Sequence, residues 1–225
     1  MDAFILAAGR GHRLRPVTDT VPKSLIPAGN STLIELRIQA LAAAGITNIV
    51  INYSHLGEQI RDHLGDGQRY GVRIRYSDES NQALETAGGI IKGLPLVESD
   101  PFLVANSDIW TDYPFADIRK NISGVAHLIL VDNPEYNPDG DFCLLDERVS
   151  RLEHCGGQPL TFSGIGVYRR SLFANRESVR SPLAPLLAEA VERGLVTGEF
   201  YPGAWIDVGT PDRLRALNTL IKGCI

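Results

Sequence analysis

A glycine-rich turn followed by several cations near the start of the chain offers chemistry for holding phosphate. Residues 6–16 read LAAGRGHRLRP, and Lys23 follows in the segment PKSLIP at 22–27. Glycines let backbone N–H groups approach phosphate oxygens without a Cβ clash. Three arginines between 10 and 15 add guanidinium groups, and Lys23 adds a compact charge. A triphosphate carries about four negative charges, so this pattern favours a triphosphate-binding loop over an ordinary solvated turn.

Two carboxylates far apart in the sequence are candidate metal ligands. Asp108 ends the apolar run FLVANSD at 102–108, and Asp207 lies in WIDVGT at 205–210. An ionised carboxylate at the end of a buried strand needs a cation or hydrogen bonds, and Mg²⁺ suits two carboxylates plus phosphate oxygens. Alone, Asp108 could be a helix N-cap and Asp207 a turn residue. Together they are candidates to hold Mg²⁺ beside bound phosphate.

The elements that must position these residues alternate between apolar strands and helix-period segments. This alternation predicts an α/β fold with a mostly parallel mixed sheet flanked by helices and a small antiparallel insertion. No hexapeptide repeat occurs, so no β-helix domain is expected. In such sheets, ligands lie beyond the carboxyl ends of the strands, which places the glycine turn and Asp108 at one crevice. We predict strands at 3–7, 48–52, 73–76, 102–105, 126–131 and 162–168, a hairpin of 142–145 with 149–152, and helices at 33–44, 58–64, 87–92, 183–193 and 211–221.

Composition excludes several classes of protein. The 225 residues are 44% hydrophobic and 22% charged with a net charge of -5, which is typical of a soluble globular protein. Without a basic stripe or an apolar run of ~20 residues, neither a nucleic acid nor a membrane is an expected partner. Three cysteines, Cys143, Cys155 and Cys224, lack the spacing of a zinc site. We expect them to be reduced thiols in a cytoplasmic protein.

Two common nucleotide-binding motifs do not fit the glycine turn. Leu14 stands where the dinucleotide-binding fingerprint needs its third glycine, and no Gly-Lys-Ser/Thr closes the loop as in a P-loop. Instead, runs 6–18 and 22–27 resemble the signature of the sugar-1-phosphate nucleotidyltransferases. The resemblance implies a Rossmann-like nucleotidyltransferase fold over one domain, 1–225. Its nucleotide half would be about 1–110, and its second half, about 111–225, would bind sugar and complete the metal site.

The resemblance also assigns residues to the nucleotide, the metal and the transfer. It implies that Mg²⁺ is held by Asp108 and Asp207, that Arg13 and Lys23 neutralise phosphate charge, and that Asn106 contacts the sugar side. The segment LETAGG at 84–89 matches a base-contacting segment of the relatives. The implied nucleotide-binding residues are Leu6, Ala8, Gly9, Gly11 and Gly88.

The second half of the chain narrows the implied substrate. Runs 130–134 (LVDNP), 140–142 (GDF) and 161–165 (TFSGI) resemble the uridylyltransferases that act on N-acetylmuramic acid 1-phosphate in peptidoglycan recycling. This likeness implies UTP and a sugar 1-phosphate as partners, with Asp141, Thr161 and Ser163 along the sugar. Two alternatives remain. One is a mannose-1-phosphate guanylyltransferase or some other sugar-1-phosphate nucleotidyltransferase, and the second is a non-catalytic nucleotide-binding regulator. A monomer or small homo-oligomer is expected.

Overall fold

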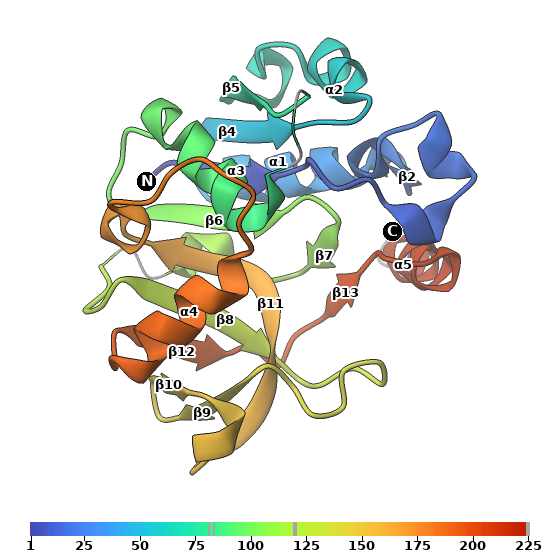
Figure 1. Cartoon of the computed structure of the whole chain (residues 1–225). Helices are drawn as coiled ribbons and strands as arrows, with labels where there is room; N and C mark the ends of the chain where they lie inside the picture. The colour runs from blue at the N-terminus through green and yellow to red at the C-terminus, as the bar shows by residue number, and fades with distance from the viewer. Residues whose placement is uncertain (81, 83, 119–120, 224–225) are drawn as a thin grey trace.

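A computed structural model describes residues 1–80, 82, 84–118 and 121–223, and a nine-stranded mixed sheet runs through it (Figure 1). The strand order is β5-β4-β1-β6-β11-β8-β12-β10-β9. The strands are β1 (Ala3–Leu6), β4 (Asn48–Tyr53), β5 (Arg73–Asp78), β6 (Phe102–Asn106), β8 (Ala126–Val131), β9 (Phe142–Leu145), β10 (Arg148–Ser150), β11 (Gln158–Tyr168) and β12 (Val196–Phe200). The α/β class and the mixed sheet predicted from the sequence are confirmed.

The first half of the chain forms the parallel part of the sheet. Strand β1 pairs in parallel with β4 on one side and β6 on the other, and β4 pairs with β5. The helices that follow are α1 (Leu33–Ala43), α2 (Gly57–Leu64) and α3 (Glu85–Gly93). Thr32 and Glu35 form a capping box at the start of α1, which satisfies two of its free backbone N–H groups. All these strands therefore end at the same edge of the sheet.

The second half is mainly antiparallel, so parallel pairing is concentrated in the first half. The long strand β11 lies antiparallel to β6, β8 and β9, while β12 is parallel to β8. The predicted hairpin is confirmed as β9 and β10, with Leu145 opposite Arg148. Helix α4 (Leu183–Glu192) covers this half, and α5 (Pro211–Gly223) follows the last strand.

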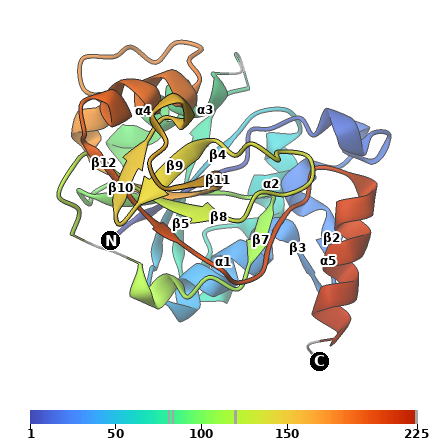
Figure 2. The same cartoon turned by 90° about the horizontal axis from the view of Figure 1, so that it is seen from below.

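The sheet is the middle of three layers, as seen from below in Figure 2. Helices α3 and α4 lie on one face and α1 on the other. One apolar core joins α1 and α2 to the sheet through Ile34, Ile38 and Ile60. A second joins α3 and α4 to the opposite face through Ile90 and Leu187. Both faces of the sheet are thus buried, as the continuous apolar strands predicted.

Several short elements were missed in the sequence. Strand β7 (Ile109–Thr111) pairs with β13 (Trp205–Asp207) in a separate two-stranded ribbon, and β2 (Pro27–Ala28) pairs with β3 (Ser31–Thr32). Two or three residues are too few to show a period of two. Strand β12 was missed too, since Gly198 and Glu199 interrupt its apolar pattern.

The prediction of reduced cysteines is wrong for two of the three. Cys143 of β9 and Cys155 form a disulfide, with Cα atoms 5.2 Å apart. The antiparallel turn of the chain through β9 and β10 brings them together across 12 residues, a proximity that no spacing rule revealed. Cys224 lies outside the described residues. Among the described residues, no helix has the length and hydropathy needed to cross a membrane.

Candidate functional site

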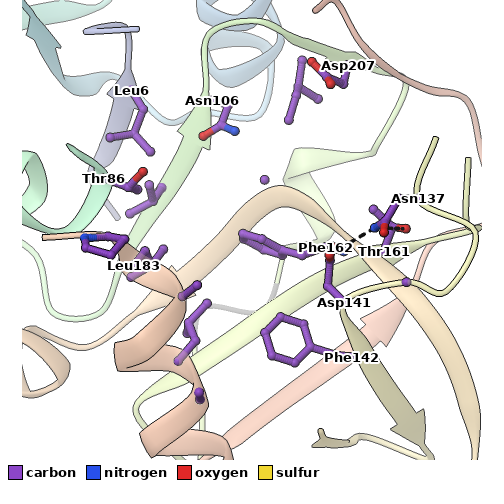
Figure 3. A pocket seen from close by; sticks show the side chains of 18 of the residues that line it. Leu6, Thr86, Asn106, Asn137, Asp141, Phe142, Thr161, Phe162, Leu183 and Asp207 are labelled. Carbon is purple, nitrogen blue, oxygen red and sulfur yellow. Dashed lines mark hydrogen bonds between the residues drawn. The ribbon is translucent and has the colours of Figure 1, made fainter. Parts of the chain in front are cut away.

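Two cavities open side by side beyond the carboxyl ends of β1 and β6. The smaller has a volume of about 400 Å³ and the larger about 970 Å³. Leu6, Thr86, Asn106 and Asp108 line both of them, so these residues form the junction between the cavities. Figure 3 shows Leu6, Thr86 and Asn106 at one end of the larger cavity and Asp141 and Thr161 at the other. A ligand in two parts can therefore meet at the junction.

The smaller cavity is lined by the glycine turn. Ala8, Gly9 and Lys23 line it directly, as predicted for a nucleotide site. A Cβ added to Gly9 would meet no heavy atom within 4 Å. The missing side chain therefore leaves open space at the cavity wall, where a ligand can approach the backbone.

Two of the predicted glycines, Gly11 and Gly88, line neither cavity. Gly11 has a φ of +64°, and a Cβ there would lie 3.0 Å from Cβ of Lys23. Gly11 thus lies beneath Lys23 and does not line either cavity. The predicted base contact Gly88 also lines neither, because its N–H donates to the carbonyl of Ser181 (3.1 Å) and a Cβ would lie 2.2 Å from the carbonyl oxygen of Val179. Its place is packing between α3 and residues 179–181.

A buried polar pair beside the glycine turn was missed by the sequence analysis. Asn52 accepts a hydrogen bond from the N–H of Ala7 (2.8 Å) and donates to Glu79 (2.7 Å). Both line the smaller cavity, and burial raises the pKa of Glu79. Asn52 lies within β4 near its carboxyl end, and Glu79 directly follows β5. Polar residues at the ends of buried strands, the signal that singled out Asp108, also mark these two.

The two predicted metal ligands come together at the junction. The backbone N–H of Val208 donates to the carbonyl of Asp108 (2.9 Å), which sets the residue after Asp207 against Asp108. Both carboxylates line the larger cavity. The β7–β13 ribbon makes this meeting possible, because it pairs Asp207 with Ile109, the neighbour of Asp108.

Each of these carboxylates has a cationic partner. Asp108 forms an ion pair with Lys23, and Asp207 accepts a hydrogen bond from Arg213 of α5 (2.7 Å). Arg213 also lies 4.2 Å from the ring centre of Tyr136, a cation–π contact. Arg13 approaches the same place, with a guanidinium nitrogen 2.6 Å from where a Cβ of Gly209 would lie. Two acids, Asp108 and Asp207, and three cations, Lys23, Arg213 and Arg13, thus surround the junction.

The donor set at the junction fits Mg²⁺. Mg²⁺ prefers oxygen ligands and is commonly bound by one or two carboxylates together with substrate phosphates. Asp108 and Asp207 supply those two carboxylates, and phosphate-binding cations lie next to them. Among the described residues there is no cluster of three or more His, Cys, Asp or Glu side chains arranged for a metal. Two carboxylates alone would leave coordination positions of Mg²⁺ for phosphate oxygens.

A buried arginine supports the junction from behind and was not found in the sequence. Arg37 of α1 is 3% exposed, donates to the carbonyl of Ile109 (2.6 Å) and lies 4.9 Å from the ring centre of Phe115. Burial lowers its pKa to about 10, against the opposing effect of Asp108, so Arg37 is charged at neutral pH. Its place in a helix-period apolar segment resembles an ordinary polar face, which is why no pattern revealed it.

The far end of the larger cavity holds a polar network. Asp141 accepts from the N–H of Phe162 (2.8 Å) and from Asn137 (3.1 Å), and Asn137 also donates to Thr161 (3.1 Å). Figure 3 shows these side chains together. Asp141 and Thr161 line the cavity as predicted, but Ser163 does not. Ser163 is 1% exposed and its carbonyl accepts from the indole N–H of Trp205 (2.9 Å), a residue that does line the cavity.

Comparisons with known proteins agree with this arrangement. A family model described as "Nucleotidyl transferase" matches residues 2–142. The chain is 48% identical to the N-acetylmuramate alpha-1-phosphate uridylyltransferase of Neisseria meningitidis serogroup B, over 98% of each chain. It is 31% identical to the protein of the same name from Caulobacter vibrioides, over 93% of this chain and 92% of the relative.

A solved structure supports the fold independently. The inositol-1-phosphate CTP transferase of T. maritima superposes with a TM-score of 0.79 at 21% identity, over 98% of this chain and 96% of the other. At that identity, the likeness concerns the fold alone, and it confirms the predicted Rossmann-like architecture. The family match and the two full-length relatives confirm the resemblance seen in the glycine turn: the chain belongs to the nucleotidyl transferase family.

Proposed function

We propose that the protein transfers a uridylyl group from UTP to N-acetylmuramic acid 1-phosphate, which gives UDP-N-acetylmuramic acid and pyrophosphate. The observation that carries this proposal is the 48% identity, over nearly the full length, to a protein of that name. The two adjoining cavities agree with it, since one can hold the nucleotide and the other the sugar. UTP is a cytoplasmic metabolite, so we place the reaction there, in the recycling of peptidoglycan sugars.

The proposed reaction is an in-line displacement at the α-phosphorus of UTP. A phosphate oxygen of the sugar 1-phosphate forms the new P–O bond while the bond to pyrophosphate breaks. No general base is needed, because a phosphate monoester with a second pKa near 6 is mostly dianionic at pH 7. Catalysis then depends on alignment and on charge stabilisation.

The residues at the junction can supply both the alignment and the charge stabilisation. The turn at Ala8 and Gly9 leaves space for the triphosphate. Lys23 of the same cavity and Arg13, which lines the larger cavity, are proposed to stabilise negative charge on it. When bound by Asp108 and Asp207, Mg²⁺ would neutralise charge on the phosphate oxygens. Lys23 already pairs with Asp108, so this lysine can hold the carboxylate in place until the metal and phosphate arrive. Asp141 and Thr161 are proposed to orient the sugar.

The decisive experiment is pyrophosphate release, with Mg²⁺, across UTP, GTP, dTTP, CTP and ATP against four sugar 1-phosphates. The sugars are N-acetylmuramic acid, N-acetylglucosamine, glucose and mannose. Turnover is expected to be greatest with UTP and the muramic acid derivative. Preference for GTP with mannose would overturn the specificity in favour of a guanylyltransferase. Binding of UTP by calorimetry without turnover of any pair would favour a non-catalytic regulator.

A further inference from the structure

The phenol of Tyr168 is a buried polar group for which the described residues offer no hydrogen-bond partner. The residue ends β11 and is 0% exposed, and its hydroxyl makes no hydrogen bond in the described structure. Such a group is costly, because a buried donor normally finds an acceptor. Burial also raises the pKa of Tyr168, so the hydroxyl stays protonated and remains a donor.

The position of this hydroxyl connects it to the larger cavity, which Tyr168 lines. The oxygen lies over Gly166 of the same strand, where an added Cβ would come within 2.8 Å of it. Gly166 in turn pairs with Val104 of β6, another residue that lines the cavity. The absence of a side chain at 166 therefore leaves the space that the hydroxyl occupies beside the cavity floor.

The walls around this part of the cavity are apolar. Helix α4 contributes Leu183, Ala184 and Leu187 on one face, and Figure 3 shows Leu183 on that helix at the cavity wall. Among the described lining residues the cations are Arg13, which lies beside Gly209, and Arg151, which is paired with Glu192. A water molecule needs two to four polar partners to be held in a buried site, and the hydroxyl alone would supply one.

We propose that the part of the cavity bounded by Tyr168, Val104 and the first turns of α4 is a subsite for the N-acetyl group of an amino-sugar 1-phosphate. The Tyr168 hydroxyl donates to the amide carbonyl, and the acetyl methyl packs against Leu183, Ala184 and Leu187. This inference rests on the proposed function and names the substituent that the sugar cavity selects.

N-acetylmuramic acid carries a second substituent, a lactyl ether with a carboxylate. The acetyl and lactyl groups differ in what it costs to bury them. Moving a carboxylate into an apolar site without a cation is far more costly than moving a neutral amide that makes its hydrogen bond. The acetyl group therefore goes to the α4 subsite, and the lactyl carboxylate stays toward the polar and open side of the cavity.

The test is Tyr168→Phe assayed on matched acetylated and deacetylated substrates. These are N-acetylmuramic acid 1-phosphate against muramic acid 1-phosphate, and N-acetylglucosamine 1-phosphate against glucosamine 1-phosphate, all with UTP. The ratio of kcat/KM between acetylated and deacetylated forms should fall roughly threefold to tenfold, the value of one neutral hydrogen bond. The free variant should melt at the same temperature as the wild type or higher, since the lost hydroxyl bonds to none of the described residues.

A matched control makes the same chemical change at a partnered hydroxyl away from both cavities. Tyr70 donates to Glu35 at 2.6 Å, so Tyr70→Phe should lower the melting temperature and leave the substrate ratio unchanged. A second variant, Ala184→Leu, adds bulk to the subsite from an exposed helix position. It should lower the ratio further without unfolding the protein.

The outcomes separate this inference from the proposed function. An unchanged ratio of kcat/KM in both Tyr168→Phe and Ala184→Leu overturns the subsite, and so does an equal loss of kcat/KM on acetylated and deacetylated sugars. In either case, turnover of N-acetylmuramic acid 1-phosphate by the wild type still upholds the proposed function. Failure of the wild type to turn over any acetylated sugar 1-phosphate overturns both. A ratio that falls in Tyr168→Phe but not in Tyr70→Phe supports the subsite.

Discussion

The two cavities of this protein are built in different ways. The smaller is lined by the continuous turn at the end of β1, with space left by Gly9 and charge supplied by Lys23, and by polar residues at the ends of β4, β5 and β6. The larger is lined by side chains from β6, β11, α4, the loop before β9 and the C-terminal ribbon. A short contiguous motif specifies the glycine-turn wall of the first cavity, whereas every wall of the second depends on how distant segments meet.

The largest effects should come from the acids at the junction, where the two cavities are not separable. Asp108→Asn or Asp207→Asn removes a carboxylate proposed to hold Mg²⁺ and should cut kcat by on the order of 10²-fold or more with either substrate saturating. Thermal melting should change little. Asp112→Asn, at an exposed acid bonded to Tyr201, is the matched control. Near-wild-type turnover of Asp108→Asn at saturating Mg²⁺ would contradict the metal assignment.

The support behind the junction should matter for stability. Arg37→Met leaves the carbonyl of Ile109 without its donor and removes a charged hydrogen bond, so the free energy of unfolding should fall by about 2 kcal/mol. Arg69→Met removes an arginine that also lies over a tyrosine ring, 4.6 Å from the centre of Tyr70, but on the surface. Its cost should stay below about 1 kcal/mol. Urea denaturation measures the free energy of unfolding of both variants. Equal losses in Arg37→Met and Arg69→Met would show that burial of Arg37 has no special role.

The nucleotide cavity can be perturbed alone through Gly9. Because a Cβ there meets nothing in the free protein, Gly9→Ala should keep the free energy of unfolding within about 0.5 kcal/mol. The methyl group enters the space proposed for UTP, and the KM for UTP should rise roughly tenfold, about 1.4 kcal/mol. The KM for the sugar 1-phosphate should not move. A rise in both KM values would mean that the cavities are coupled more tightly than their construction indicates.

The sugar cavity can likewise be perturbed alone, through Asp141. Asp141→Asn keeps the shape of the side chain but removes its charge, and the KM for the sugar 1-phosphate should rise roughly fivefold, about 1 kcal/mol. The KM for UTP should stay at the wild-type value. Steady-state kinetics with each substrate varied in turn measures both. An effect on UTP alone would place Asp141 outside the sugar site.

The same contrast explains what could be predicted from sequence. The glycine turn, Lys23 and Asp108 lie in contiguous motifs whose chemistry can be read directly, and the structure brings them to one edge of the sheet. Gly88 was placed by analogy with a base-contacting segment, but its surroundings depend on residues 179–181. The Cys143–Cys155 disulfide and the role of Arg37 likewise depend on partners distant in the sequence or on burial. Tertiary contacts of this kind leave no local pattern.

The β7–β13 ribbon has a consequence for the order in which the protein acquires its function during synthesis. The glycine turn and Asp108 emerge from the ribosome about a hundred residues before Asp207. The second acid arrives only when Trp205–Asp207 pairs with Ile109–Thr111. Because a domain generally folds as a unit, a chain still being translated cannot carry out the proposed transfer until this ribbon has formed. Completion of the site is a late event that reports on the folding of the whole chain.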